Sequence, residues 1–262
     1  MAPGGILITM QQVIWEGDTR LGHYQVVDTP YDGRPARVLY SGNRQAAQSG
    51  VAKDGGRDLL FDYIQRMFEL AQGVAPRSVL VIGGGVGTLP KALYDRLPDV
   101  YIDVVEPDEG LTKLAYDYFD LPVDDRIAIF HTDGRAFLRG HATRYDMIFV
   151  DAFNHTTIPP DLRTLETFQA YQKHLNKNGV LVVNVISTYH GSGTQPLQPL
   201  YAAALQTFDA VDVFLASKGY SLWLPQNFVL AAQQGIEHLL QEYVRYKAVN
   251  PPEINPGSVL HD

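Results

Sequence analysis

The stretch SVLVIGGGVG, residues 78–87, decides the fold of this chain of 262 residues. It is an apolar run of strand length that breaks into glycines, and a glycine-rich turn lets a ligand approach the backbone closely. A second apolar run, YIDVVE at residues 101–106, ends in the acid Glu106. An acid in this place can accept hydrogen bonds from both hydroxyls of a ribose. The two runs together predict a nucleoside-binding half-site at the tips of neighbouring strands.

After residue 78, apolar runs of strand length alternate with stretches of helical periodicity. This alternation predicts an α/β fold with a mostly parallel sheet that is covered on both faces. We expect strands at 79–82, 101–106, 127–131, 146–150, 180–185, 211–216 and 227–232, and helices at 58–71, 88–96, 109–118, 165–175 and 199–208. Because no helical pattern separates the last two strands, we expect a hairpin with one antiparallel strand at the sheet edge.

The first part of the chain has a different pattern. Short alternating runs at 6–14, 23–28 and 36–40, separated by turn residues, predict a small antiparallel meander. We therefore divide the chain into a small N-terminal β domain (1–56), a Rossmann-like catalytic domain (57–246) and a tail (247–262). The prolines of the tail predict poor order.

Composition limits the classes of function. The chain has no cysteine, which excludes disulfides and thiolate metal sites. Its formal net charge of -8 argues against nonspecific nucleic-acid binding and is compatible with a cationic substrate. No apolar run reaches the roughly 18 residues that span a bilayer, and residues 1–10 lack a signal-peptide pattern. We expect a cytoplasmic protein with neither a nucleic-acid nor a membrane partner.

Three carboxylates follow three of the expected parallel strands. Glu106 ends the second strand, Asp133 follows the third, and Asp151 ends the fourth. Ligands of open parallel sheets bind beyond the carboxyl ends of the strands, so we expect these acids to face one crevice. Each acid alone could instead cap the helix or turn that follows it.

The glycine loop distinguishes two classes of nucleoside ligand. It lacks a clear G-x-G-x-x-G spacing and has Pro90 near the helix start, so it would hold a pyrophosphate poorly. A sulfonium nucleoside carries no phosphate, and Glu106 for its ribose with Asp133 and Gly134 for its adenine suits it better. S-adenosylmethionine or its decarboxylated form is therefore favoured over NAD.

Seven short motifs occur in a fixed order between residues 23 and 232. They are HYQ (23–25), SGNRQ (41–45), FDY (61–63), IGGGVG (82–87), VEPD (105–108), TDGRAF (132–137) and VDAF (150–153). This order resembles the spermidine synthase family of polyamine aminopropyltransferases. The resemblance implies a class I methyltransferase-type Rossmann-like sheet behind a small N-terminal antiparallel β domain, and a homodimer formed through that domain.

The resemblance also implies an activity and its site. The activity is that of a transferase in polyamine biosynthesis, which moves an aminopropyl group from decarboxylated S-adenosylmethionine to a small-molecule amine, leaves methylthioadenosine and uses no metal. Asp151 would be the catalytic carboxylate that serves the amine, and Tyr63 and Asn154 would lie at the amine site. The residues expected to bind the nucleoside cofactor are Gln25, Gln45, Gly83, Gly85, Gly87, Glu106, Asp133 and Gly134.

Three positions depart from the family pattern. Family members usually carry acids where this chain has Asn154, Val86 and Gln65. An ammonium that loses a carboxylate partner at about 4 Å gives up as much as about 4 kcal/mol at an effective dielectric constant of about 20. Two alternatives therefore stay open: an S-adenosylmethionine-dependent methyltransferase on the same scaffold, and a catalytically weak nucleoside-binding module.

Overall fold

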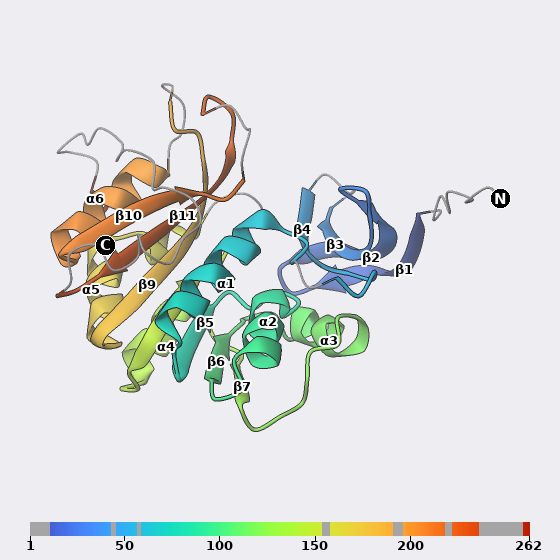
Figure 1. Ribbon diagram of the computed structural model, residues 1–262, viewed down its shortest axis with the longest axis horizontal. Helices are drawn as coiled ribbons and strands as arrows, with labels where there is room; N and C mark the ends of the chain where they lie inside the picture. The colour runs from blue at the N-terminus through green and yellow to red at the C-terminus, as the bar shows by residue number, and fades with distance from the viewer. Residues whose placement is uncertain are drawn as a thin grey trace.

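The computed structural model contains two β-sheets that lie side by side (Figure 1). It describes residues 11–42, 46–56, 59–153, 158–190, 196–217, 222–235 and 259–262. The N-terminal sheet is antiparallel, with strands in the order β1 (Gln12–Thr19), β2 (Gly22–Tyr31), β3 (Arg34–Ser41) and β4 (Ala46–Ala52). The antiparallel arrangement is confirmed, but the predicted end of the first strand at residue 14 is wrong, because β1 continues to Thr19; residues 6–10 of that prediction lie outside the described residues. β4 is a strand that the sequence did not predict.

The larger sheet has seven strands in the order β10-β11-β9-β8-β5-β6-β7. Their bounds are β5 (Ser78–Ile82), β6 (Tyr101–Val105), β7 (Ile127–Phe130), β8 (Tyr145–Val150), β9 (Leu175–Ser187), β10 (Ala210–Leu215) and β11 (Gln226–Gln233). All the strands predicted after residue 78 are present, which confirms the α/β class. The strand order reverses between β5 and β8, the place where open parallel sheets bind their ligands.

The expected position of the antiparallel strand is wrong. β11 pairs antiparallel with both β9 and β10, so it lies inside the sheet and β10 forms the edge. All but one of the residues of β11 are buried. A strand that is apolar on both faces is more stable between two neighbours than at an exposed edge, which explains the order.

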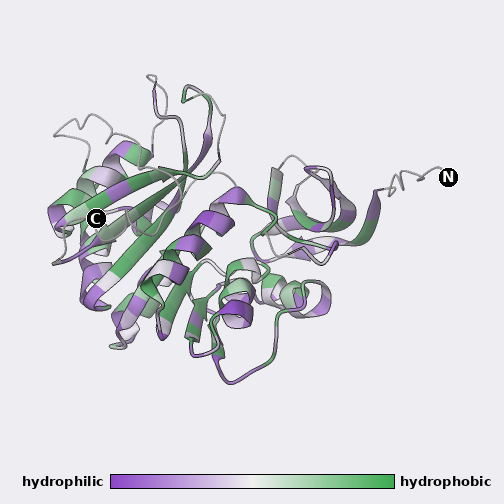
Figure 2. Cartoon of the chain, viewed as in Figure 1, coloured by the Kyte–Doolittle hydropathy of each residue, from purple (hydrophilic) through white to green (hydrophobic). Residues whose placement is uncertain are grey.

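Helices cover both faces of the larger sheet. They are α1 (Asp62–Val74), α2 (Thr88–Arg96), α3 (Glu109–Tyr118), α4 (Gly134–Gly140), α5 (Leu165–Lys173) and α6 (Leu197–Thr207). α1 and α2 pack on one face, and α4, α5 and α6 pack on the other. In Figure 2 the strands between these layers are mainly hydrophobic, whereas the helices also carry hydrophilic residues. Among the residues described, no helix has both the length and the apolar character needed to cross a membrane.

Asp108 connects the N-terminal sheet to the larger one. It is fully buried and caps α3 by accepting hydrogen bonds from two backbone amides of the first turn. Its Oδ2 accepts from the Thr19 hydroxyl at 2.5 Å and from the Leu21 amide at 2.8 Å. Burial alone would raise the pKa of Asp108, but these donors outweigh burial and hold it below its usual value. The turn between β1 and β2 is thereby fixed beside the end of β6.

Candidate active site

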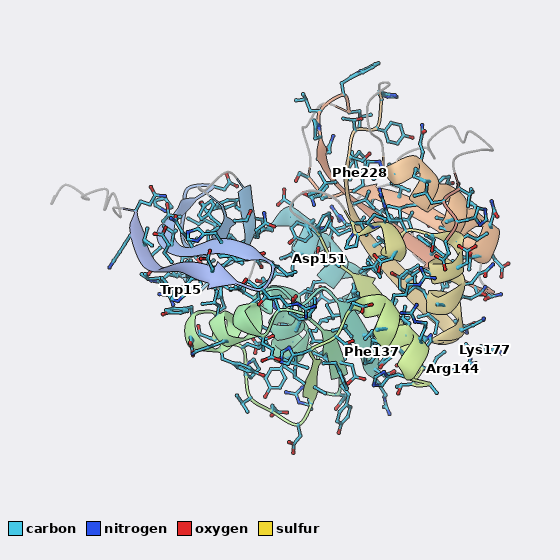
Figure 3. All side chains as sticks on the ribbon, turned by 180° about the vertical axis from the view of Figure 1, so that it is seen from behind. Trp15, Phe137, Arg144, Asp151, Lys177 and Phe228 are labelled. Carbon is cyan, nitrogen blue, oxygen red and sulfur yellow. The ribbon has the colours of Figure 1, made fainter. Side chains whose placement is uncertain are left out.

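A cavity of about 340 Å³ lies between the two sheets, at the carboxyl ends of β5, β6 and β8. Asp151 lies in the middle of the molecule, between the N-terminal sheet and the larger sheet (Figure 3). The cavity is lined by the following residues that were predicted from the sequence: Tyr63, Gly83, Gly85, Glu106, Asp133, Gly134 and Asp151. The three acids expected to face one crevice therefore share one cavity.

The glycine loop after β5 forms part of the cavity wall and is locked between two strands. Gly83 has a φ of +92°, and a Cβ at this residue would lie 2.4 Å from the carbonyl oxygen of Asp151. The Gly83 amide donates to the Val105 carbonyl at 2.9 Å, and the Asp151 amide donates to the Ile82 carbonyl at 2.8 Å. Only glycine fits this conformation and this space, which explains the residue type.

Glu106, at the end of β6, holds the glycine loop through its carboxylate. Its Oε2 accepts from the Gly85 amide at 2.7 Å, and its Oε1 accepts from the Asp108 amide at 3.0 Å. Burial raises the pKa of Glu106, and backbone hydrogen bonds from Asp108, Gly85 and Gly84 oppose that rise. Glu106 also lines the cavity, so its carboxylate can accept a hydrogen bond from a ligand there.

Asp151 follows β8 directly, and the pKa of its carboxyl group lies near neutral pH. Its Oδ1 accepts from Nδ2 of Asn184 at 2.8 Å, and its carboxylate also accepts from the Tyr63 hydroxyl. Burial raises the pKa of Asp151 to about 7, while Asn184 and Tyr63 limit the rise because they donate to the ionised form. A carboxylate with this pKa can accept a proton near neutral pH.

Tyr63 lies in the first turn of α1, where it reaches across to the N-terminal sheet. Its hydroxyl lies 3.4 Å from the backbone carbonyl of Gln48 in β4. Burial and the neighbouring Asp151 raise the pKa of Tyr63 well above its usual value. The hydroxyl therefore keeps its proton and acts as a donor at the boundary between the sheets.

Asp133 combines both interpretations offered by the sequence. It caps α4 by accepting from the Ala136 amide at 2.7 Å, and it lines the cavity. At Gly134, the next residue, a Cβ would lie 2.6 Å from a methyl group of Ile82. The absence of a side chain at Gly134 therefore lets α4 begin directly against β5.

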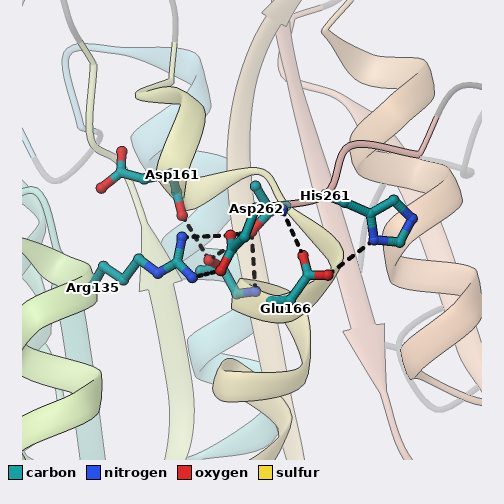
Figure 4. Close-up of polar contacts among 7 residues, drawn as sticks. Arg135, Asp161, Glu166, His261 and Asp262 are labelled. Carbon is teal, nitrogen blue, oxygen red and sulfur yellow. Dashed lines mark hydrogen bonds and ion pairs between the residues drawn. The ribbon is translucent and has the colours of Figure 1, made fainter.

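Residues 259–262 are bound next to the cavity wall that Asp161 and Leu162 form (Figure 4). The Asp262 carboxylate forms an ion pair with Arg135, and the backbone amide of Asp262 donates to the Glu166 carboxylate at 3.2 Å. Poor order was predicted for the whole tail, and that prediction is wrong for these four residues because the ion pair and hydrogen bonds fix them. The rest of the tail lies outside the described residues.

Four predicted residues are not placed in the cavity wall. Gln25 lies in β2, and its neighbour Tyr24 lines the cavity instead, because successive side chains of a strand point to opposite faces. Gly87 begins α2, where a Cβ would lie 2.9 Å from Leu121, so its place in the fold is a packing contact. Gln45 and Asn154 lie outside the described residues.

Two of the departures from the family pattern have a structural account. Val86 is fully buried and packs with Leu39 and Leu111 in the core between α3 and the N-terminal sheet. The side chain of Gln65 accepts from the Leu59 amide at 3.2 Å. Neither residue lines the cavity.

Several polar residues of the site were not predicted. Asn184 is only 1% exposed, and the available signal was a single amide in the apolar run VLVVNVI at 180–186. Ser49 and Thr88 also line the cavity, and their hydroxyls are 2.6 Å apart. No local pattern could identify this pair, because Ser49 lies in β4 and Thr88 is the first residue of α2, and the two meet only in the folded protein.

Comparisons with known proteins point to one family. Residues 64–189 match the family model of the spermine/spermidine synthase domain. A probable polyamine aminopropyl transferase of Bifidobacterium longum is 39% identical over 147 residues, which cover 56% of this chain and 32% of that protein. A polyamine aminopropyltransferase of Streptococcus uberis is 34% identical over 149 residues, which cover 54% of this chain and 51% of that protein.

Solved structures have the same fold. A crystal structure of a probable spermidine synthase from Corynebacterium glutamicum superposes with a TM-score of 0.73 at 19% identity, covering 85% of this chain and 80% of that chain. In these alignments the chain spans 32% to 51% of the length of the first curated relatives. The family model, the curated relatives and the shared fold agree with the order of motifs along the sequence. Residues 64–189 of this chain are therefore similar to the spermine/spermidine synthase domain, and the fold is that of a probable spermidine synthase.

Proposed function

We propose that this protein transfers the aminopropyl group of decarboxylated S-adenosylmethionine to a small-molecule amine and releases methylthioadenosine. The observation that carries the proposal is the place of Asp151: a carboxylate with a pKa of about 7 adjoins the glycine loop, in the same cavity as Glu106. The curated relatives, which are named polyamine aminopropyltransferases, support it.

The nucleoside end of the donor fits the acids beyond β6 and β7. Glu106 lines the cavity, where its carboxylate can accept from the ribose hydroxyls, and its backbone contacts already hold it in place. Asp133 and Gly134 lie on the cavity wall, where they can contact the adenine. The glycine loop gives the sulfonium end of the donor close access to the backbone.

Asp151 is the residue that binds and deprotonates the amine in the proposed reaction. A primary amine with a pKa of about 10.4 is mostly protonated at neutral pH and is not a nucleophile in that form. Asp151 attracts the ammonium, accepts its proton and leaves the nitrogen lone pair free. The nitrogen then attacks the carbon attached to sulfur, the carbon–sulfur bond breaks, and the sulfonium leaves as a neutral thioether. A positioned base of this kind contributes about 10²- to 10⁴-fold to the rate.

Ligand preference tests the proposal directly. We expect calorimetry to show at least about tenfold tighter binding of decarboxylated S-adenosylmethionine than of S-adenosylmethionine, because the extra carboxylate of the latter would lie near ionised Asp151. Amine transfer by the purified protein completes the test. Tighter binding of S-adenosylmethionine with methyl transfer would support the methyltransferase alternative, and nucleoside binding without any turnover would support the binding module.

Replacing Glu106 tests the nucleoside half of the site. Glu106→Gln removes the charge that the Gly85 amide and the ribose hydroxyls would share, and we expect methylthioadenosine affinity to fall by about tenfold or more, since hydrogen bonds to charged groups contribute about 1.5–3 kcal/mol. Titration calorimetry measures the change. Glu109→Gln, at an exposed residue of the first turn of α3, is the matched control and should keep the affinity. Equal affinities in both variants would remove Glu106 from the site.

A homodimer formed through the N-terminal sheet and a location in the cytoplasm also stay predictions. Of the apolar residues at the start of β1, Ile14 and Trp15 pack against the core between α3 and the N-terminal sheet, and Val13 is 37% exposed. Light scattering of the full chain decides whether a second copy covers this sheet.

A further inference from the structure

Asn184 is a buried amide whose two polar ends are both occupied. It lies in β9, and the parallel register pairs Val150 with Val183, so the residues that follow them, Asp151 and Asn184, are neighbours. Its Nδ2 donates to Oδ1 of Asp151 at 2.8 Å, and its Oδ1 accepts from Nδ2 of Asn227 at 2.9 Å. The three side chains therefore form one chain of hydrogen bonds across β8, β9 and β11.

The donors of this chain all point toward Asp151. A carboxamide has one donor end and one acceptor end, and either end can face a neighbour. The amino group of Asn184 faces Asp151, and Nδ2 of Asn227 donates to the oxygen of Asn184, which is the arrangement that matches this orientation. A donor in this place stabilises the ionised carboxylate, whereas an acceptor would stabilise the protonated acid. It also occupies Oδ1 of Asp151.

We propose that Asn184 and Asn227 are positioning residues, which together fix the orientation of the Asp151 carboxylate and favour its ionised form. The proposal rests on the proposed function for its catalytic consequence only, since the hydrogen-bond chain exists without a substrate. Asn227 acts through Asn184 and does not touch the carboxylate itself. Asn184 is only 1% exposed, and its two hydrogen bonds satisfy an amide that would destabilise the fold without partners.

The titration of Asp151 is the primary measurement. With ¹³C-labelled aspartate carboxyl groups, NMR follows its ionisation, and the Asp151→Asn spectrum identifies its signal. Asn184→Leu keeps the side-chain size and removes the donor. We expect the titration midpoint of Asp151 to rise by about one pH unit, as is typical of a lost charge-assisted hydrogen bond. Below that midpoint, kcat/KM for amine transfer should fall by about tenfold, and it should recover at higher pH.

A double-mutant cycle tests whether Asn227 acts through Asn184. Asn227→Leu should shift the Asp151 midpoint in the same direction by a smaller amount. The double variant should match Asn184→Leu alone, because Asn227 has no effect once its intermediary is gone. Fully additive shifts of the Asp151 midpoint would overturn the proposal that Asn227 acts through Asn184. Asn227 is only partly buried, so Asn227→Leu carries the test if Asn184→Leu does not fold.

The chain contains a matched control. Nδ2 of Asn176, also in β9, donates to Oδ1 of Asp146, also in β8, at 2.8 Å. This pair lies at the opposite ends of the two strands from Asp151, near Arg144 and Lys177 (Figure 3). Asn176→Leu should lower the stability of the fold and leave the Asp151 titration unchanged.

The outcomes separate this inference from the proposed function. If Asn184→Leu shifts the Asp151 titration but the natural sequence shows no amine transfer, the positioning role of Asn184 is supported and the proposed activity is rejected. If Asn184→Leu leaves the Asp151 titration unshifted, the positioning role is rejected whatever the activity.

Discussion

Asp151→Asn is expected to abolish amine transfer while the protein stays folded and continues to bind methylthioadenosine within a few-fold of the original affinity. Asparagine has nearly the same shape and can still accept the hydrogen bond from Asn184 at the Oδ1 position. It cannot accept a proton from an ammonium ion. The expected loss is therefore at least about 10²- to 10⁴-fold in kcat, the contribution of a positioned base.

The pH dependence of the unsubstituted enzyme belongs to the same prediction. Asp151 must be ionised, so kcat/KM should rise with pH through about 7, the pKa set by burial of this carboxyl group. In the proposed reaction the amine binds as an ammonium ion, so kcat/KM should fall again near about pH 10. Asp212→Asn, a change of the same kind in the edge strand β10, should leave kcat and both the rise and the fall of the kcat/KM pH profile unchanged. An Asp151→Asn variant that keeps its turnover would reject the assigned role.

Stability gives an independent check on the Asp151 environment. Its pKa is about 7 in the folded protein and about 3.9 in the unfolded chain. A raised pKa stabilises the fold fully below about pH 4, and that contribution is lost as the pH rises through about 7. The free energy of unfolding of the natural sequence should therefore fall over this range relative to that of Asp151→Asn. Denaturant titrations at several pH values measure the difference.

The parts of the fold that were predicted correctly have strong local signals. α3 begins and ends at the predicted residues 109 and 118, and the Asp108 side chain caps it as a helix-starting acid does. β5 is a short run that is apolar from Val79 to Ile82, and β6 is mainly apolar, as expected for parallel strands inside a sheet. Where the local pattern and the final burial agree, sequence alone is sufficient.

The missed elements depend on tertiary contacts. β4 has the sequence AAQSGVA, which contains no aromatic residue and a single β-branched one, Val51, and it is ordered by pairing with β3. α4 has only seven residues, too few to show helical periodicity. Neither element could be predicted from its own sequence.

The residues of the site also divide into those that the sequence predicted and those that depend on tertiary contacts. The acids at strand ends could be placed from sequence, because the carboxyl ends of parallel strands meet at one edge of a sheet. Gln25 illustrates what sequence does not determine: a shift of one residue along β2 puts Tyr24 in the cavity wall instead. The contacts of Asp151 with Asn184 and Tyr63 depend on how β8, β9 and α1 pack, and no motif encodes them.

Gly83→Ala is expected to damage the fold and the site together. The new Cβ would lie 2.4 Å from the carbonyl oxygen of Asp151, at a φ of +92° that other residues rarely adopt. The backbone strain alone costs about 1–3 kcal/mol, and the clash adds to it because the hydrogen bond between the Asp151 amide and the Ile82 carbonyl holds that segment in place. We expect the free energy of unfolding to fall by about 3 kcal/mol or more.

Gly85→Ala provides the comparison that isolates the contact. Gly85 also has a positive φ, +50°, but no atom lies within 4 Å of the position of its Cβ. The left-handed conformation alone costs about 1–2 kcal/mol for alanine, so this variant should lose less stability than Gly83→Ala. If denaturant titrations showed equal losses of unfolding free energy in the two variants, the residue that follows β8 would have to move away from the new Cβ at little cost. A larger loss at Gly83, with amine transfer also reduced, would show that the loop and the Asp151 backbone form one rigid unit. In the proposed reaction, that rigidity would keep the Asp151 carboxylate at a fixed distance from the sulfonium of the donor.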